Sequence, residues 1–194
     1  MEITKERAEE YYQKGVMALE KNQYDYAIQN FKSAISLDQT LRKARSGIIL
    51  ARSRKLKKTE ATPNSLNFQA ALSLWKAFFF ERIKKLEKAA DSYEDYLAIM
   101  EPQAQVYLRL GEIYWKMNQF ADAMDNLQNA LKLVPTHAPA LRDLGHIYLH
   151  QGLLNEARQV FDRYLQLVPT DSKVLSELKN IEAMLTIDRG RLSV

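Results

Sequence analysis

Hydrophobic and polar residues alternate along this chain with the period of an α-helix. Between residues 72 and 86 the apolar side chains return every three or four positions, at Leu72, Trp75, Phe79, Ile83 and Leu86. That spacing places them on one side of a helix and predicts that this side packs in the core. The three consecutive phenylalanines at 78–80 point in different directions on a helix, so they cannot form one platform for stacked nucleotide bases.

The pattern repeats with a period of 34 residues, at which residues 107–135 superpose on residues 141–169. The matched pairs include Gly111 with Gly145, Tyr114 with Tyr148, Ala123 with Ala157, and Pro135 with Pro169. Small residues let two helices of one unit approach closely, and the prolines end the second helix. The segment 11–39 fits the same frame, with glycine and alanine at its two small positions.

The turn inside each unit is expected to need a left-handed residue, which glycine or asparagine supplies at the least cost. Asn22, Asn118 and Gly152 occupy this place in the three regular units. In the segment 70–102 the same frame fits less well, and Lys84 stands at the turn. The spacing between the first unit and the second is also irregular, so the register slips there.

These residues and this period resemble the tetratricopeptide repeat, a helix–turn–helix unit of 34 residues. The resemblance implies an all-α fold, namely an α-solenoid in which antiparallel helix pairs form a right-handed superhelix closed by a C-terminal capping helix. Few glycines and prolines and many helix-forming residues agree with that fold class.

The frame divides the chain into six segments. They are a first repeat (1–40), an extra basic helix and linker (41–69), a degenerate repeat (70–103), two regular repeats (104–137 and 138–171), and a capping helix and tail (172–194). We expect the extra helix to pack against the first repeat and Asn64 or Ser65 to cap the helix that follows. The capping helix is expected over 172–186, followed by a frayed tail.

The resemblance also implies where a partner would bind. In the family, the first helices of successive units line the concave wall of the stack. Carried over residue by residue, the partner-binding positions are Leu74, Phe78, Arg82, Leu108, Glu112, Trp115, Lys116, Arg142, His146, Leu149 and His150. Aromatic and arginine side chains contribute most to binding energy. We therefore expect a non-enzymatic scaffold or adaptor that binds a peptide or helix with some acidic residues during complex assembly.

Some relatives grip the C-terminal carboxylate of a peptide with a lysine and an asparagine on this wall. At the matching positions this chain has Leu108 and Glu112 in one unit, and Arg142 and His146 in the next. The clamp is not reproduced, so we do not expect chaperone tails as ligands.

The net charge of +4 is unevenly distributed, because residues 42–58 contain eight cations and no acid. These are Arg42, Lys43, Arg45, Arg52, Arg54, Lys55, Lys57 and Lys58. An alternative function is therefore that this helix binds nucleic acid or an anionic membrane surface, with an affinity that falls steeply with salt. The other interpretation is a solvated helix face. A second alternative function is self-assembly, in which another copy of the chain fills the groove of a homo-oligomer.

Catalytic and cofactor motifs are not found in the sequence. It has no cysteine and no glycine-rich phosphate loop. His146 and His150 have a spacing that can hold a metal, but no HExxH pattern accompanies them, and we expect a surface instead. We expect no enzyme activity, no metal and no cofactor. The charged N-terminus and the lack of a long apolar run predict a cytoplasmic protein.

Overall fold

The computed structural model describes residues 2–38, 41–58 and 62–192. Within these ranges the chain forms ten α-helices and no strand, and most helices pair with a neighbour in sequence. The all-α, helical-repeat class that the sequence predicts is confirmed. The helices belong to two compact units, Met1–Pro102 and Gln103–Val194, which are described separately below.

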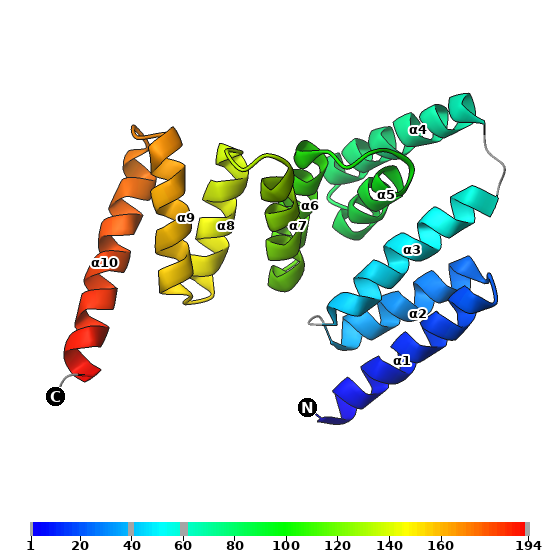
Figure 1. The fold of residues 1–194 in the computed structure, drawn as a ribbon, viewed down its shortest axis with the longest axis horizontal. Helices are drawn as coiled ribbons and strands as arrows, with labels where there is room; N and C mark the ends of the chain where they lie inside the picture. Colours follow the sequence, from blue (N-terminus) through cyan, green and yellow to red (C-terminus); the bar gives the residue numbers. More distant parts are fainter. Residues whose placement is uncertain (1, 39–40, 59–61, 193–194) are drawn as a thin grey trace. The chain divides into compact units, whose positions relative to one another are not determined.

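Unit 1 contains two helical hairpins and one further helix (Figure 1). Its helices are α1 (Glu2–Glu20), α2 (Tyr24–Leu37), α3 (Arg42–Lys58), α4 (Pro63–Arg82) and α5 (Leu86–Ile99). The hairpins are α1–α2 and α4–α5, and α3 packs mainly on α2 while also reaching α1 and α5. As expected from the sequence, the basic helix α3 lies against the first repeat.

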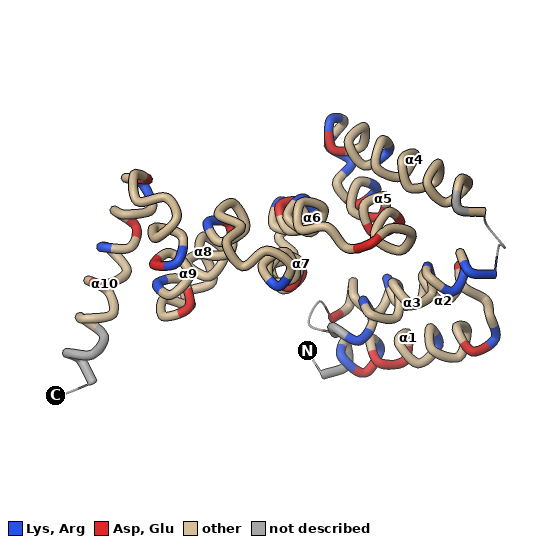
Figure 2. The backbone as a smooth tube through the Cα atoms, turned by 45° about the horizontal axis from the view of Figure 1, so that its top comes forward, with Lys and Arg blue, Asp and Glu red and all other residues tan. Residues whose placement is uncertain are grey.

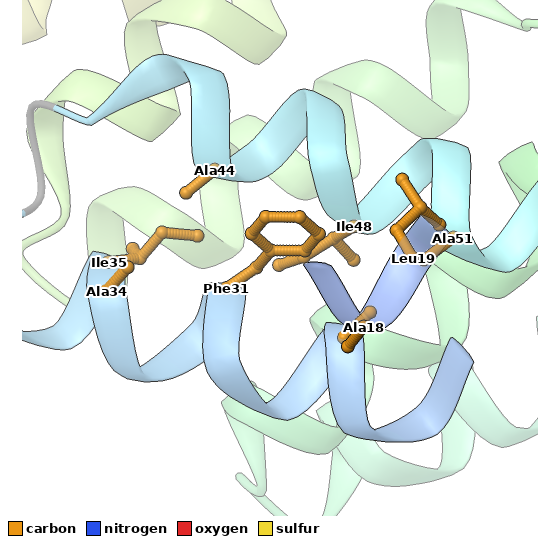
Figure 3. Packing of buried hydrophobic residues seen from close by; sticks show 9 residues of the cluster. Ala18, Leu19, Phe31, Ala34, Ile35, Ala44, Ile48 and Ala51 are labelled. Carbon is orange, nitrogen blue, oxygen red and sulfur yellow. The ribbon is translucent and has the colours of Figure 1, made fainter. Parts of the chain in front are cut away.

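The centre of the first hairpin is the ring of Phe31, which is 1% exposed. Gly15 of α1 and Gly47 of α3 both lie against this ring, and a Cβ atom added to either glycine would come within 2.6 Å of it. Ala44 and Ile48 of α3 complete the cluster (Figure 3). Helix α3 therefore packs on α2 as α1 does, in the manner of the first helix of a following repeat.

The side chain of Arg52, which is only 7% exposed, connects α3 to α5. Its guanidinium lies 3.0 Å from a carboxylate oxygen of Asp91 and 2.9 Å from one of Glu94, and it also donates to the backbone carbonyl of Asp91. Burial lowers the pKa of Arg52, but Glu94, Asp95 and Asp91 more than offset this and hold the pKa above its usual value. Arg52 is therefore a charged group of the unit's interior.

Unit 2 is built from two regular hairpins and a final helix. Its helices are α6 (Ala104–Lys116), α7 (Phe120–Leu133), α8 (Ala138–His150), α9 (Leu154–Leu167) and α10 (Ser172–Leu192). The hairpins are α6–α7 and α8–α9, and α10 packs on α9. Gly111 lies against Leu127 and Gly145 against Phe161, as the small-residue positions of the repeat predict.

Asp171 immediately precedes the final helix, and its carboxylate accepts hydrogen bonds from the backbone N–H groups of Lys173 and Val174 at 3.1 and 3.2 Å. Tyr164 of α9 donates its hydroxyl hydrogen to the same carboxylate at 2.8 Å. The Tyr164 bond and the Val174 N–H lower the pKa of Asp171. The same residue thus caps α10 and ties it to α9.

The turns of all four helical hairpins are left-handed at the same place. The φ angles are +58° at Asn22, +57° at Lys84, +59° at Asn118 and +72° at Gly152. The expectation for the two asparagines and the glycine is confirmed. Lys84 takes the same conformation although a side chain of this kind disfavours it, so the degenerate repeat retains the turn of the regular ones.

Two boundaries differ from the sequence-based expectation. Helix α4 begins at Pro63, before the expected cap, and its own cap is Thr62, whose side-chain oxygen accepts from the backbone N–H of Ser65 at 3.4 Å. The prediction that Asn64 or Ser65 is the cap was therefore wrong, because proline favours the first helical position and places the cap before it. Helix α10 continues to Leu192, beyond the predicted end at 186.

Candidate partner-binding surfaces

Three helices of unit 2 meet through polar and aromatic side chains that remain partly exposed. The ring of Trp115 on α6 lies 6.2 Å from the ring of His146 on α8. His146 Nε2 in turn lies 3.0 Å from a carboxylate oxygen of Glu177 on α10. We call this the α6–α8–α10 surface, and define it by Glu112, Trp115, Lys116, Arg142, His146, Leu149, His150 and Glu177.

The side chains of this surface are held by the repeat behind them. His146 is 19% exposed, and its ring meets the edge of Phe161 at 5.3 Å, the residue that also packs on Gly145. Arg142 pairs with the buried Asp143 at 3.0 Å, with 43% of its own side chain exposed. The surface therefore offers an indole, an imidazole and a guanidinium in constrained positions, which lowers the entropy lost on binding.

One predicted member of the wall is not available to a partner. Leu108 is 4% exposed and belongs to the core of unit 2, so we remove it from the proposed surface. Its neighbour Glu112 is 23% exposed and pairs with Arg109 at 3.0 Å, three residues earlier on the same helix. His150 is exposed and its ring lies 4.9 Å from that of Phe120. Sequence reasoning missed Glu177, which lies on the helix interpreted as a cap.

The other predicted positions, Leu74, Phe78 and Arg82, belong to α4 in unit 1. Phe78 is 51% exposed and meets the edge of the buried Tyr93 at 6.0 Å. Leu74 is half-buried and Arg82 is exposed.

Several cations of α3 are engaged inside unit 1. Lys43 pairs with Glu9 at 2.7 Å, Lys55 pairs with Asp25, and Arg52 is buried among acids of α5. Figure 2 shows the basic positions of α3 beside acidic positions of α1 and α5. The basic helix is therefore partly neutralised within its own unit, which leaves fewer cations for phosphates than the sequence suggests. The side chain of Arg42 lies outside the described residues.

The sequence contains a signal for the burial of Arg52. Ala44, Ile48, Ala51 and Arg52 fall at helical spacing on one side of α3, and all four are buried. A cation on the apolar side of a helix indicates an internal ion pair rather than a solvated face.

The largest departure from the sequence-based expectation is on α4. The residues Phe68, Leu72, Trp75, Phe79 and Ile83 are 70%, 38%, 63%, 46% and 42% exposed. Four of them were assigned to a core face, and that assignment was wrong. The side that packs on α5 includes Ala70 and Ala77, which are 2% and 0% exposed. We call these five exposed residues the α4 stripe.

Unit 1 also contains a cleft of 420 Å³ between helices α2, α3, α4 and α5. Its lining includes Lys32, Arg52, Lys55, Lys76, Asp91 and Asp95. Lys32 and Arg52 both pair with Asp91, and Lys55 pairs with Asp25. Most of the cleft's charges are thus balanced by one another.

Two kinds of site were also sought in the structure. Within the described ranges, no three histidine, cysteine or acidic side chains gather as a metal ion would need. No helix in the described part of the chain is long and apolar enough to cross a membrane.

Models of known families match two parts of the sequence. A model described as "Tetratricopeptide repeat" matches residues 108–172, and a second with the same description matches residues 6–41. Together they span about half of the chain. No curated protein matches the sequence significantly.

Solved structures of similar fold are helical repeat proteins. The second TPR domain of human RPAP3, in complex with the HSP70 peptide SGPTIEEVD, is 25% identical with a TM-score of 0.54, over 60% of this chain and 98% of that one. The first TPR of Spaghetti (RPAP3), bound to the HSP90 peptide SRMEEVD, is 21% identical with a TM-score of 0.56, over 61% and 94%. YrrB, a TPR protein with an unusual peptide-binding site, is 17% identical with a TM-score of 0.50, over 91% and 76%.

Proposed function

Because the chain belongs to the tetratricopeptide repeat family, we propose that it is a non-enzymatic scaffold that binds a peptide or helix of a partner protein. The proposed binding site is the α6–α8–α10 surface, and the proposed role is to hold that partner during assembly of a larger complex. Tetratricopeptide repeats are interaction modules, and the RPAP3 domains that resemble this fold are bound to peptides.

The observation that supports this site most strongly is the contact series from Trp115 through His146 to Glu177. It joins the first helices of two regular repeats to the final helix in one half-exposed surface. Trp115 and Arg142 are of the residue types that act as binding anchors. Lys116 and Arg142 supply positive charge, which suits a partner segment with acidic residues.

The ligand that we propose differs from those of the RPAP3 domains, whose peptides end in EEVD. At the positions where some relatives grip a terminal carboxylate, this chain has the buried Leu108 and the ion-paired Glu112 in one repeat. In the next repeat it has Arg142 and His146, which already pair with Asp143 and Glu177. Glu112 would repel a terminal carboxylate rather than bind it. We therefore propose that the partner segment is internal, as in a helix or an extended peptide.

The test compares proteins captured by the wild type with those captured by Trp115→Ala/Arg142→Ala, using quantitative mass spectrometry. Because Arg142→Ala removes the partner of the buried Asp143, circular dichroism and thermal unfolding must first show that the variant is folded. We expect the variant to lose a specific partner at least about tenfold. A folded variant that captures the same proteins in the same amounts contradicts the proposed site.

A further inference from the structure

The α4 stripe is an apolar surface about 22 Å long, since Phe68 and Ile83, the C-cap residue of α4, are 15 residues apart and a helix rises about 1.5 Å per residue. Phe68 and Trp75 are its most exposed members, at 70% and 63%. Trp75 and Phe79 stack on each other with ring centroids 5.7 Å apart and planes 10° apart. Contiguous exposed aromatics of this kind mark interaction sites on folded proteins.

Most of the stripe lies on the side of α4 opposite to α5, and Leu72 at its edge also borders the cleft between α2, α3, α4 and α5. Successive residues turn by about 100° around a helix axis, so Trp75 and Phe79, each two residues from the buried Ala77, point away from α5. Both sides of α4 are therefore apolar, and only one is covered within unit 1. A helix with two apolar sides is expected to pack on both of them.

The charges around the stripe are positive. Residues 63–80 contain no acid, and the cations Lys76, Arg82, Lys84 and Lys85 are all exposed, with Lys76 also bordering the cleft that contains Asp91 and Asp95. The carboxylate of Glu81 does not neutralise these cations, because it faces α5 and accepts a hydrogen bond from the hydroxyl of Tyr93 at 2.8 Å. The surface beside the stripe thus attracts a negatively charged partner.

We propose that the α4 stripe docks an amphipathic helix of a partner protein whose apolar seam is flanked by acidic residues. The stripe residues Phe68, Leu72, Trp75 and Phe79 follow each other at intervals of four, three and four, which is the spacing of the seam between two packed helices. The helices involved differ from those of the α6–α8–α10 surface, so this docking site does not depend on that one.

A second copy of the chain suits the stripe less well. A second α4 helix would bring the same four cations and no acid to meet them. Neither parallel nor antiparallel packing of two α4 helices would therefore form an ion pair between them. A bilayer surface can also bind aromatic side chains and cations, but it does not require apolar residues at intervals of three and four along the helix. Both occupants are outcomes of the experiment.

The test selects helix-forming peptides from a displayed random library against the full chain. We expect the selected peptides to carry apolar residues every three or four positions, with aspartate or glutamate beside them. The best peptide should bind Trp75→Ser/Phe79→Ser about 30-fold or more weakly. It should bind Lys76→Glu/Arg82→Glu/Lys85→Glu at least about tenfold more weakly, and its affinity for the wild type should fall with salt.

Two controls separate this inference from the proposed function and from a folding defect. Trp115→Ala should bind the selected peptide as the wild type does. Because Trp75 and Phe79 are exposed, their replacement should leave the melting temperature unchanged or higher.

Four results would overturn the proposal. The first is that none of the selected peptides combines apolar residues every three or four positions with acidic residues beside them. The second is that the best peptide binds Trp75→Ser/Phe79→Ser as tightly as the wild type. The third is sedimentation with phosphatidylglycerol-containing vesicles that depends on the stripe, in the absence of peptide binding. The fourth is a dimer, measured by light scattering, that the same double substitution abolishes.

Discussion

Unit 1 and unit 2 pack their helices together through different side-chain contacts. In unit 2 each hairpin closes with one glycine against one large side chain, Gly111 on Leu127 and Gly145 on Phe161. In unit 1 one ring, Phe31, meets glycines from two helices, and the next helix pair is joined through Arg52. The regular repeats of unit 2 thus use one contact twice, whereas unit 1 shares one ring between two helices and joins its next helix pair through an ion pair.

The largest expected effect is therefore that of Phe31→Ala. It should lower the free energy of unfolding of unit 1 by about 3–5 kcal/mol, because it leaves a cavity between α1, α2 and α3. Urea unfolding combined with hydrogen exchange would measure it. Phe161→Ala, the matched change in unit 2, should cost about as much but lower protection only in unit 2. Equal protection of α3 in the Phe31 variant and the wild type would contradict the shared role of this ring.

Arg52→Ala should have the next largest effect. It leaves the carboxylates of Asp91 and Glu94 without their buried partner and should cost about 2–4 kcal/mol, somewhat less than for fully buried acids. Arg109→Ala in unit 2 is the control, because the partly exposed pair of Arg109 with Glu112, three residues apart on one helix, should contribute only about 0.5 kcal/mol. Chemical denaturation measures both, and equal costs would show that Arg52 is no more than a surface cation.

Lys84→Gly should be stabilising. Glycine removes the steric penalty of a left-handed side chain, so we expect a gain of about 0.5–1 kcal/mol after its greater freedom in the unfolded state is included. Lys85→Gly is the matched control, since Lys85 has a φ of −88° and gains nothing from glycine. A destabilised Lys84→Gly variant, measured by thermal unfolding, would mean that its side chain contributes more than its backbone strain removes.

The smallest effect is a dependence on pH at Asp171. Since the pKa of Asp171 is lowered in the folded state, its contribution is present above the unfolded pKa and disappears as the pH falls through the folded pKa. The melting temperature of unit 2 should therefore fall in acid, and Asp171→Asn should weaken that dependence, because asparagine still caps the helix. An identical acid profile for the two proteins would count against the cap. In unit 1, Glu9 has a pKa lowered by hydrogen bonds from Lys43 and Gln13 and should act in the same direction.

The regular part of the fold could be predicted because its signals are local. A glycine that packs on a large residue and an asparagine at a left-handed turn recur at fixed intervals, and each has its own steric reason. The turn at Lys84 could not be predicted from its residue type, since it forms there without the glycine or asparagine that favours a left-handed conformation. The neighbouring repeats impose the geometry that the side chain alone would not choose.

The α4 stripe could not be predicted in the same way. Periodicity shows that a helix has an apolar side but not which of two apolar sides packs in the core. The sequence favours the side with Trp75 and Phe79 because these residues are large. The structure instead buries the small Ala70 and Ala77 of α4, while α5 supplies the large buried side chains Tyr93 and Tyr96.

The ring of Phe31 has a consequence for how this chain is made. During synthesis the first forty residues leave the ribosome before α3 does, and the side of Phe31 that Gly47 later covers has no neighbour at that moment. We expect the nascent first hairpin to remain incomplete until the basic helix emerges. Slow translation of the codons that follow α3, which must be read before α3 leaves the ribosome, would prolong that exposed interval, whereas unit 2 can close each hairpin as soon as its second helix is complete.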